Sequence, residues 1–172
     1  MNYNPKLIDF FKRHNMYDEK TFKYLSSHTT MIDYNDPEQR DFVGCFYILD
    51  NNNILQSLVL DLPYVNNEKT MLISIHELTH GIENYSKIGK KFKKDITCEA
   101  LPILYEKLYI NEFPSEELLS YSKYLDNLII NNCEKEYQFA LAIREELLKN
   151  YNYDMKKMSK LTKKLSKKHH YN

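Results

Sequence analysis

The chain has 172 residues, 42% of them apolar and 13% aromatic, and its 24 basic residues balance 24 acidic residues. This length is enough for one domain with its own core, and the aromatic content excludes a disordered chain. Three separated cysteines without a CxxC pair argue against a disulfide framework or a thiolate zinc site. With neither a signal peptide nor a membrane span evident in the sequence, we expect a single cytoplasmic domain over residues 1–172.

Two short helices are predicted near the N-terminus. Asn4 followed by Pro5 is typical of a helix start, and Asp18 is a preferred capping residue for a second helix. The whole chain contains three glycines, which leaves few positions for tight turns. Helices are therefore favoured over a sheet of many strands.

A pair of strands is predicted next. Residues 42–49 and 54–60 are rich in apolar residues, and residues 50–53 between them (Asp-Asn-Asn-Asn) favour a turn. We therefore expect a β-hairpin, with residues 58–62 as an edge strand able to hold an extended peptide. The fold class predicted for the chain is α+β and mostly helical, with this small hairpin or sheet beside the next helix.

Helices account for the remainder of the chain. Glu68 follows two asparagines and starts a helix whose apolar residues repeat every 3.6 positions. A lysine-rich loop and Asp95 precede another helix, which Pro114 ends. Two more helices are expected at residues 115–130 and 134–150.

The C-terminal segment, residues 151–172, is predicted to be a basic helix. Residues 149–172 contain eight lysines and one acid, so they carry about +7 and the preceding residues about −7. The simplest interpretation of such a segment is a solvated helix face. The alternatives are binding to nucleic acid, to an anionic membrane surface or to an acidic partner.

The strongest chemical motif is His76-Glu77-Leu78-Thr79-His80, an HExxH sequence on the helix that follows the strands. Residues four apart lie on one face of a helix, so both imidazoles can reach one ion. Glu77 beside them can take a proton from a metal-bound water. Six histidines and 14 glutamates in this length give about 0.02 chance matches, so the motif predicts one zinc ion per chain.

The third zinc ligand has two candidates in the sequence. Glu83 follows His80 by three residues on the same helix, but one helix rarely supplies three ligands around a tetrahedral ion. Glu99 lies on the following helix and would complete the two-histidine, one-glutamate set of catalytic zinc sites. The sequence therefore favours Glu99 as the ligand and Glu83 as a supporting or surface acid.

The HExxH motif followed by Glu99-Ala100 resembles the gluzincin metallopeptidases. Residues 99–106 are more similar to the oligopeptidase F and thimet oligopeptidase family than to thermolysin, because Glu106 follows Glu99 by seven residues. The resemblance covers roughly residues 68–110 and implies a zincin-like minimal domain. It also implies that Glu106 orients a ligand, whereas Thr79 stands where that family usually has glycine.

The predicted function is zinc-dependent peptide-bond hydrolysis, with Glu77 as the general base. Tyr137, Tyr151 and Tyr153 are candidate donors to the oxyanion that forms on the scissile carbonyl. The expected partner is a peptide or protein substrate. Two alternatives are a regulatory zinc protease acting on one protein partner, as in the ImmA-like family, and a non-catalytic helical protein that binds through its basic tail.

Overall fold

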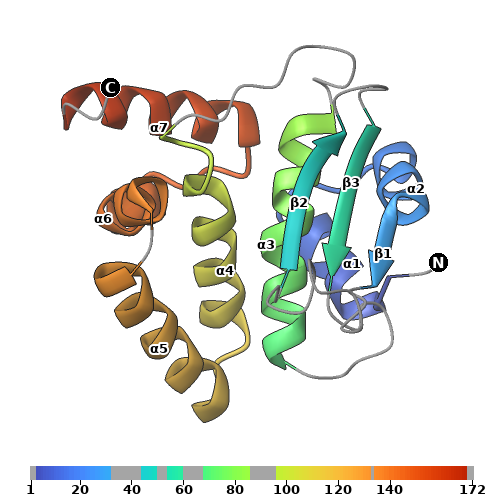
Figure 1. Cartoon of the computed structure of the whole chain (residues 1–172), viewed down its shortest axis with the longest axis horizontal. Coiled ribbons are helices and arrows are strands. Elements are labelled where there is room, and N and C mark those ends of the chain that lie inside the picture. The colour runs from blue at the N-terminus through green and yellow to red at the C-terminus, as the bar shows by residue number, and fades with distance from the viewer. Residues whose placement is uncertain are drawn as a thin grey trace. The chain divides into compact units, whose positions relative to one another are not determined.

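A computed structural model describes residues 3–31, 44–49, 54–59, 68–85, 96–132 and 134–169 (Figure 1). The chain divides into two units, Met1–Phe92 and Lys93–Asn172. Each unit has its own helices and its own buried apolar residues.

The first unit combines helices with one sheet. Its elements are α1 (Pro5–Arg13), α2 (Glu19–Ser27), β1 (Thr29–Met31), β2 (Gly44–Leu49), β3 (Ile54–Val59) and α3 (Glu68–Tyr85). The turn predicted at residues 50–53 lies outside the described residues.

The two predicted helix starts in this unit are confirmed. The backbone N–H of Lys6 donates to Asn4 Oδ1 at 2.9 Å, and Pro5 occupies the first helical position. The N–H of Thr21 donates to Asp18 Oδ1 at 3.1 Å. This hydrogen bonding by Thr21 lowers the pKa of the Asp18 carboxyl below its usual value. Side-chain acceptors thus satisfy amides that have no partner inside the helix.

The sheet has three strands in the order β1-β3-β2. Strand β3 pairs in parallel with β1, where Thr29 lies opposite Ser57, and antiparallel with β2, where Gly44 lies opposite Val59. Because β3 is central, the prediction that the second strand forms an edge is wrong for residues 58 and 59. Residues 60–62 lie outside the described part of the chain.

The predicted fold class is also corrected by the structure. Seven helices dominate the described residues, and no strand occurs in the described residues of the second unit, 96–132 and 134–169. The class of the chain as a whole is therefore corrected from α+β to predominantly helical, whereas the antiparallel strand pair expected beside the next helix is present as β2 and β3. Within the first unit the sheet is mixed rather than a simple hairpin, because β1 joins it in parallel. Strand β1 was not predicted, because three residues are too few to show the alternating pattern of a strand.

Helix α3 is packed inside the first unit, against β2, β3 and α2. Leu72, Ile75 and Leu78 on this helix are at most 1% exposed. At Gly81 an added Cβ would lie only 2.9 Å from the Cδ2 atom of Leu25 on α2. The glycine therefore permits a close approach of α2 to the end of α3 that carries His80.

The second unit consists of four helices in its described residues. They are α4 (Ala100–Glu112), α5 (Glu116–Asn132), α6 (Lys135–Lys149) and α7 (Met155–Lys168). These bounds agree with the helices predicted after Asp95, at residues 115–130 and 134–150, and in the C-terminal segment. Helix α4 packs against α6 and α7, and its Leu104, Tyr105 and Tyr109 are fully buried.

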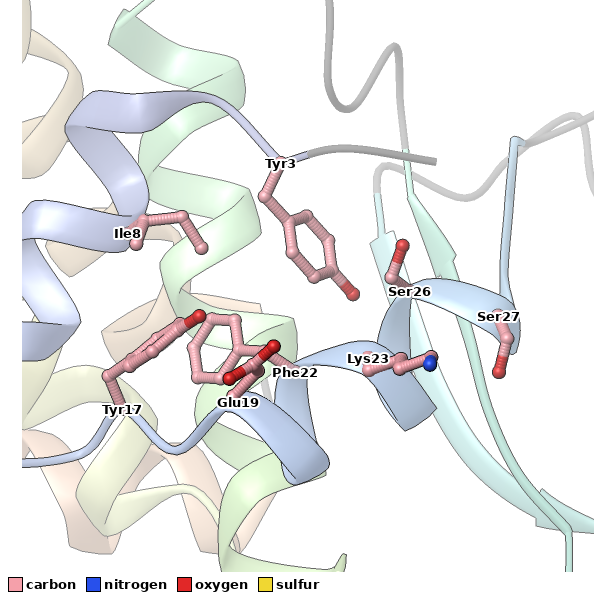
Figure 2. Close-up of a pocket in the computed structure, with 8 residues that line it drawn as sticks. All are labelled: Tyr3, Ile8, Tyr17, Glu19, Phe22, Lys23, Ser26 and Ser27. Atoms are coloured by element: carbon pink, nitrogen blue, oxygen red, sulfur yellow. The ribbon is translucent and has the colours of Figure 1, made fainter.

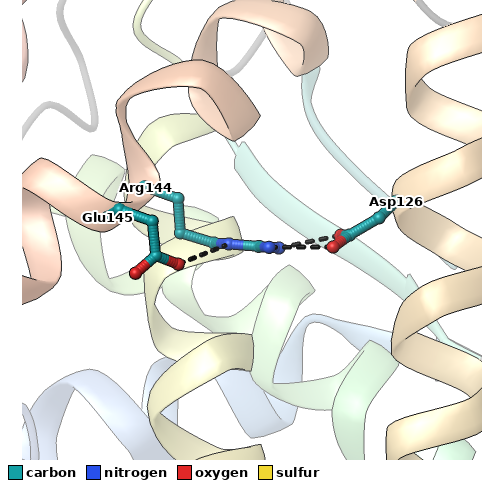
Figure 3. A network of polar contacts seen from close by, with 3 residues as sticks. All are labelled: Asp126, Arg144 and Glu145. Atoms are coloured by element: carbon teal, nitrogen blue, oxygen red, sulfur yellow. Dashed lines mark hydrogen bonds and ion pairs between the residues drawn. The ribbon is translucent and has the colours of Figure 1, made fainter.

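An ion pair joins α5 to α6 in this unit (Figure 3). Arg144 donates from Nη1 and Nη2 to the two oxygens of Asp126, each at 2.8 Å. The Arg144 side chain is 13% exposed, and this bonding raises its pKa above the usual value. Because both oxygens are bonded and the position is partly buried, this ion pair should contribute more to the stability of the fold than an ordinary surface ion pair does.

Replacing Asp126 with asparagine should lower the free energy of unfolding by about 2 kcal/mol, because it removes charge-assisted bonds to a guanidinium that stays buried. Urea unfolding of the full chain measures this change. Glu145→Gln is the matched control, since Glu145 is 69% exposed and lies 3.9 Å from Arg144 Nε. The control should shift stability by less than about 0.5 kcal/mol. Equal losses in the two variants would contradict a special role for Asp126.

Candidate metal centre

The HExxH motif lies in the middle of α3. The rings of His76 and His80 have centroids 5.0 Å apart and planes inclined at 71°. The His76 residue is 9% exposed, and His80 is half-buried. The predicted placement of both imidazoles one turn apart on a single helix is therefore confirmed, and the pair can offer two nitrogens to one ion.

The proposed general base follows the first histidine directly. Glu77 is 6% exposed, which is unusual for a carboxylate. A buried acid beside two histidines is the arrangement expected of a group that exchanges protons with a metal-bound water. Its burial also distinguishes Glu77 from the exposed acidic residues of the chain.

Hydrogen bonds within α3 hold the backbone around the motif. The Thr79 hydroxyl donates to the carbonyl of Ile75 at 2.7 Å, so this threonine satisfies its hydroxyl within the helix. The Asn84 amide donates to the carbonyl of His80 at 2.9 Å, and Asn84 is 3% exposed. Asn84 was not predicted, because an asparagine four residues after a ligand carries no motif of its own.

Glu99 belongs to the second unit, immediately before α4. The sequence predicted that Glu99 lies within that helix. In the structure it is the N-cap residue, one position before the first helical residue. Its side chain makes no capping hydrogen bond, and the residue is 5% exposed. The thiol of Cys98 donates to Glu99 Oε1 at 3.4 Å.

His76, His80 and Glu99 are the one group of three His, Cys, Asp or Glu side chains, within the described part of the chain, that could hold a metal ion. This is the ligand set that the sequence favoured. Two imidazoles and one carboxylate leave a fourth tetrahedral position for water. The chemistry of the donor set therefore fits zinc and fits an open catalytic site better than a closed structural one.

The two supporting acids predicted from the sequence lie on different helices. Glu83 is half-buried on α3, three residues after His80. Glu106 is half-buried on α4. Burial raises the pKa of the Tyr121 phenol and the charge of Glu106 adds to that rise, whereas the raised pKa of Arg144 comes first from its bonds to Asp126 and only lastly from Glu106. The described contacts thus place Glu106 beside charged and phenolic groups of its own unit. Its suggested role in orienting a ligand stays a prediction.

The three tyrosines proposed as oxyanion donors also lie in the second unit. Tyr137 is half-buried on α6, and Tyr153 is 55% exposed with a φ of 54°. Tyr151 packs edge-on against Tyr105, with ring centroids 6.1 Å apart. Burial, and then the neighbouring Tyr105, raises the pKa of Tyr151 above its usual value, so this phenol keeps its proton. Their role in catalysis stays a prediction.

A pocket of about 690 Å³ lies elsewhere in the first unit, among α1, α2 and the residues around them (Figure 2). Its lining residues are Tyr3, Ile8, Tyr17, Glu19, Phe22, Lys23, Ser26 and Ser27. None of them belongs to α3, so this pocket is distinct from the HExxH motif.

Comparisons with known proteins add no assignment. No protein family model, no curated protein and no solved structure matches the chain. Among the described residues, no helix is long and apolar enough to cross a membrane.

Proposed function

We propose that the protein is a zinc-dependent peptidase in which His76, His80 and Glu99 bind the metal. The observation that carries this proposal is the HExxH motif on α3, with two imidazoles one turn apart and a buried glutamate beside the first. HExxH on a helix supplies both the ligands and the base of metal-assisted amide hydrolysis. A surface helix with two incidental histidines would not bury His76 and Glu77 together.

The chemistry divides between the ion and the side chains. Bound zinc would lower the pKa of its water to about 7 and polarise the scissile carbonyl. Glu77 would accept the proton from that water and pass it to the leaving amine. Tyr137, Tyr151 and Tyr153 remain the candidate donors to the oxyanion that would develop on the scissile carbonyl.

The sheet of the first unit offers a way to bind an extended substrate. Strand β2 has one sheet neighbour, β3, among the described residues, and α3 packs against both strands. A peptide added along β2 would form main-chain hydrogen bonds that do not depend on its sequence. This assigns substrate binding to β2 instead of the residues near 58–62 that the sequence indicated.

Metal content and peptide cleavage test the proposal together. The purified chain should contain one zinc per molecule by mass spectrometry, and it should cleave members of a mixed peptide library. A chelator should abolish cleavage, and added zinc should restore it. Stoichiometric zinc without cleavage of any peptide or candidate protein partner would contradict the enzyme and would favour the non-catalytic alternative. Absence of bound zinc would contradict the metal site itself.

A further inference from the structure

Helix α7 presents lysines over one continuous surface. All seven of its lysines are exposed: Lys156, Lys157, Lys160, Lys163, Lys164, Lys167 and Lys168. At 3.6 residues per turn they fall within an arc of about 140° around the helix. We call these seven side chains the α7 lysine face.

The opposite side of α7 packs against other helices of the second unit. Met158, Thr162, Leu165 and Ser166 are buried, and the helix packs against α6 and α4. An amphipathic helix that binds a membrane needs a free apolar side to enter the lipid boundary. Helix α7 has no such side, so its interactions with a partner must be made by the lysines.

Intramolecular acids neutralise only the ends of the α7 lysine face. Lys157 lies 3.7 Å from Asp154, and Lys168 lies 3.8 Å from Glu146. The other five lysines of this face, Lys156, Lys160, Lys163, Lys164 and Lys167, have no ion pair with any described residue. Most of the positive charge on this helix is therefore available to an external anion.

We propose that the α7 lysine face binds the phosphate backbone of duplex DNA without sequence preference. From Lys156 to Lys167 the helix rises about 16.5 Å, at 1.5 Å per residue. Duplex DNA carries about ten phosphates over that length, at one charge per 1.7 Å. About half of these phosphates belong to each strand, so five unpaired lysines can be matched by the phosphates of a single strand over the same length.

The composition of the α7 lysine face defines the mode of binding. Residues 155–168 contain no arginine and no aromatic residue. Lysine acts mainly as a point charge and lacks the planar fork with which arginine makes paired hydrogen bonds, and stacking on single-stranded bases relies on aromatic rings. B-form DNA also has a major groove about 12 Å wide that admits a helix, whereas the major groove of A-form RNA is narrow. Backbone contact with duplex DNA remains as the favoured mode.

Fluorescence anisotropy with a labelled duplex of about 20 base pairs tests this proposal. Five phosphate contacts should give a slope of log K against log salt of about −4.5, which is an affinity loss of about 500-fold between 50 and 200 mM. The variant Lys160→Gln, Lys163→Gln, Lys167→Gln should reduce the magnitude of that slope by about 2.7. Arginine at the same three positions should preserve binding, because it keeps the charge.

A matched control removes three exposed lysines outside α7: Lys20→Gln, Lys123→Gln and Lys135→Gln. It changes the net charge equally and should leave the slope unchanged. Thermal unfolding of each variant verifies that the fold is intact. Failure of the wild type to bind DNA at 50 mM salt, or equal binding by the α7 variant, would overturn the proposal. Binding to anionic vesicles or to duplex RNA in preference to DNA would overturn it as well. Glu77→Gln should bind DNA normally, so this result is independent of the proposed peptidase activity.

Discussion

Replacing Glu77 with glutamine should lower kcat/KM for peptide hydrolysis by about 10²–10⁴, the usual contribution of a general base. Glutamine has nearly the same shape as glutamate, but its amide cannot accept the proton of a metal-bound water. Zinc content should stay at one per chain, because Glu77 is not among the three proposed ligands. Hydrolysis of a single cleaved peptide, measured together with metal content, checks both parts of this expectation.

The matched control for this variant is Glu83→Gln on the same helix. Glu83 is half-buried, lies three residues after His80 and is proposed to take no part in proton transfer. Its replacement should change kcat/KM by about tenfold at most, the lower end of the 10–100-fold cost of losing a residue that supports a ligand. If Glu77→Gln cleaves peptide at the wild-type rate, the proposed base is wrong. If Glu83→Gln alone abolishes cleavage while zinc content stays at one per chain, the base lies at Glu83.

Local signals in the sequence predicted most of the helices. Asn4 and Asp18 accept the capping bonds that their positions suggested, and Lys6 and Thr21 are the donors. Such caps depend on residues two or three positions apart, so no tertiary information is needed. The same holds for His76 and His80, whose common face follows from helical spacing alone.

Sheet topology depended on contacts that the sequence does not display. The second strand was expected at an edge, yet β3 is central because β1, more than 20 residues earlier, pairs with it in parallel. Pairing between distant segments follows no local period. Glu99 shows a smaller difference: the sequence placed it on the following helix, whereas it is the N-cap residue one position before α4.

Removing the carboxylate of Glu99 should weaken zinc binding by at least about 100-fold. Loss of a residue that only supports a ligand costs 10–100-fold in affinity, and loss of a ligand should cost more. His76→Ala and His80→Ala should weaken binding similarly, because each removes one of three protein donors. Competition with a chromophoric zinc chelator measures these affinities, and the thermal shift produced by added zinc should fall in parallel.

The same measurement on Glu106→Ala separates a ligand from a supporting acid. Glu106 lies two helical turns beyond Glu99 on α4, and its charge acts on Tyr121 and Arg144. Its removal should therefore cost less zinc affinity than the removal of Glu99. Full retention of zinc by Glu99→Ala would exclude Glu99 as a ligand, and a loss in Glu83→Ala would then identify Glu83 as the third donor. Loss of zinc in Glu99→Ala, with wild-type affinity in Glu83→Ala, is the result that the proposed ligand set requires.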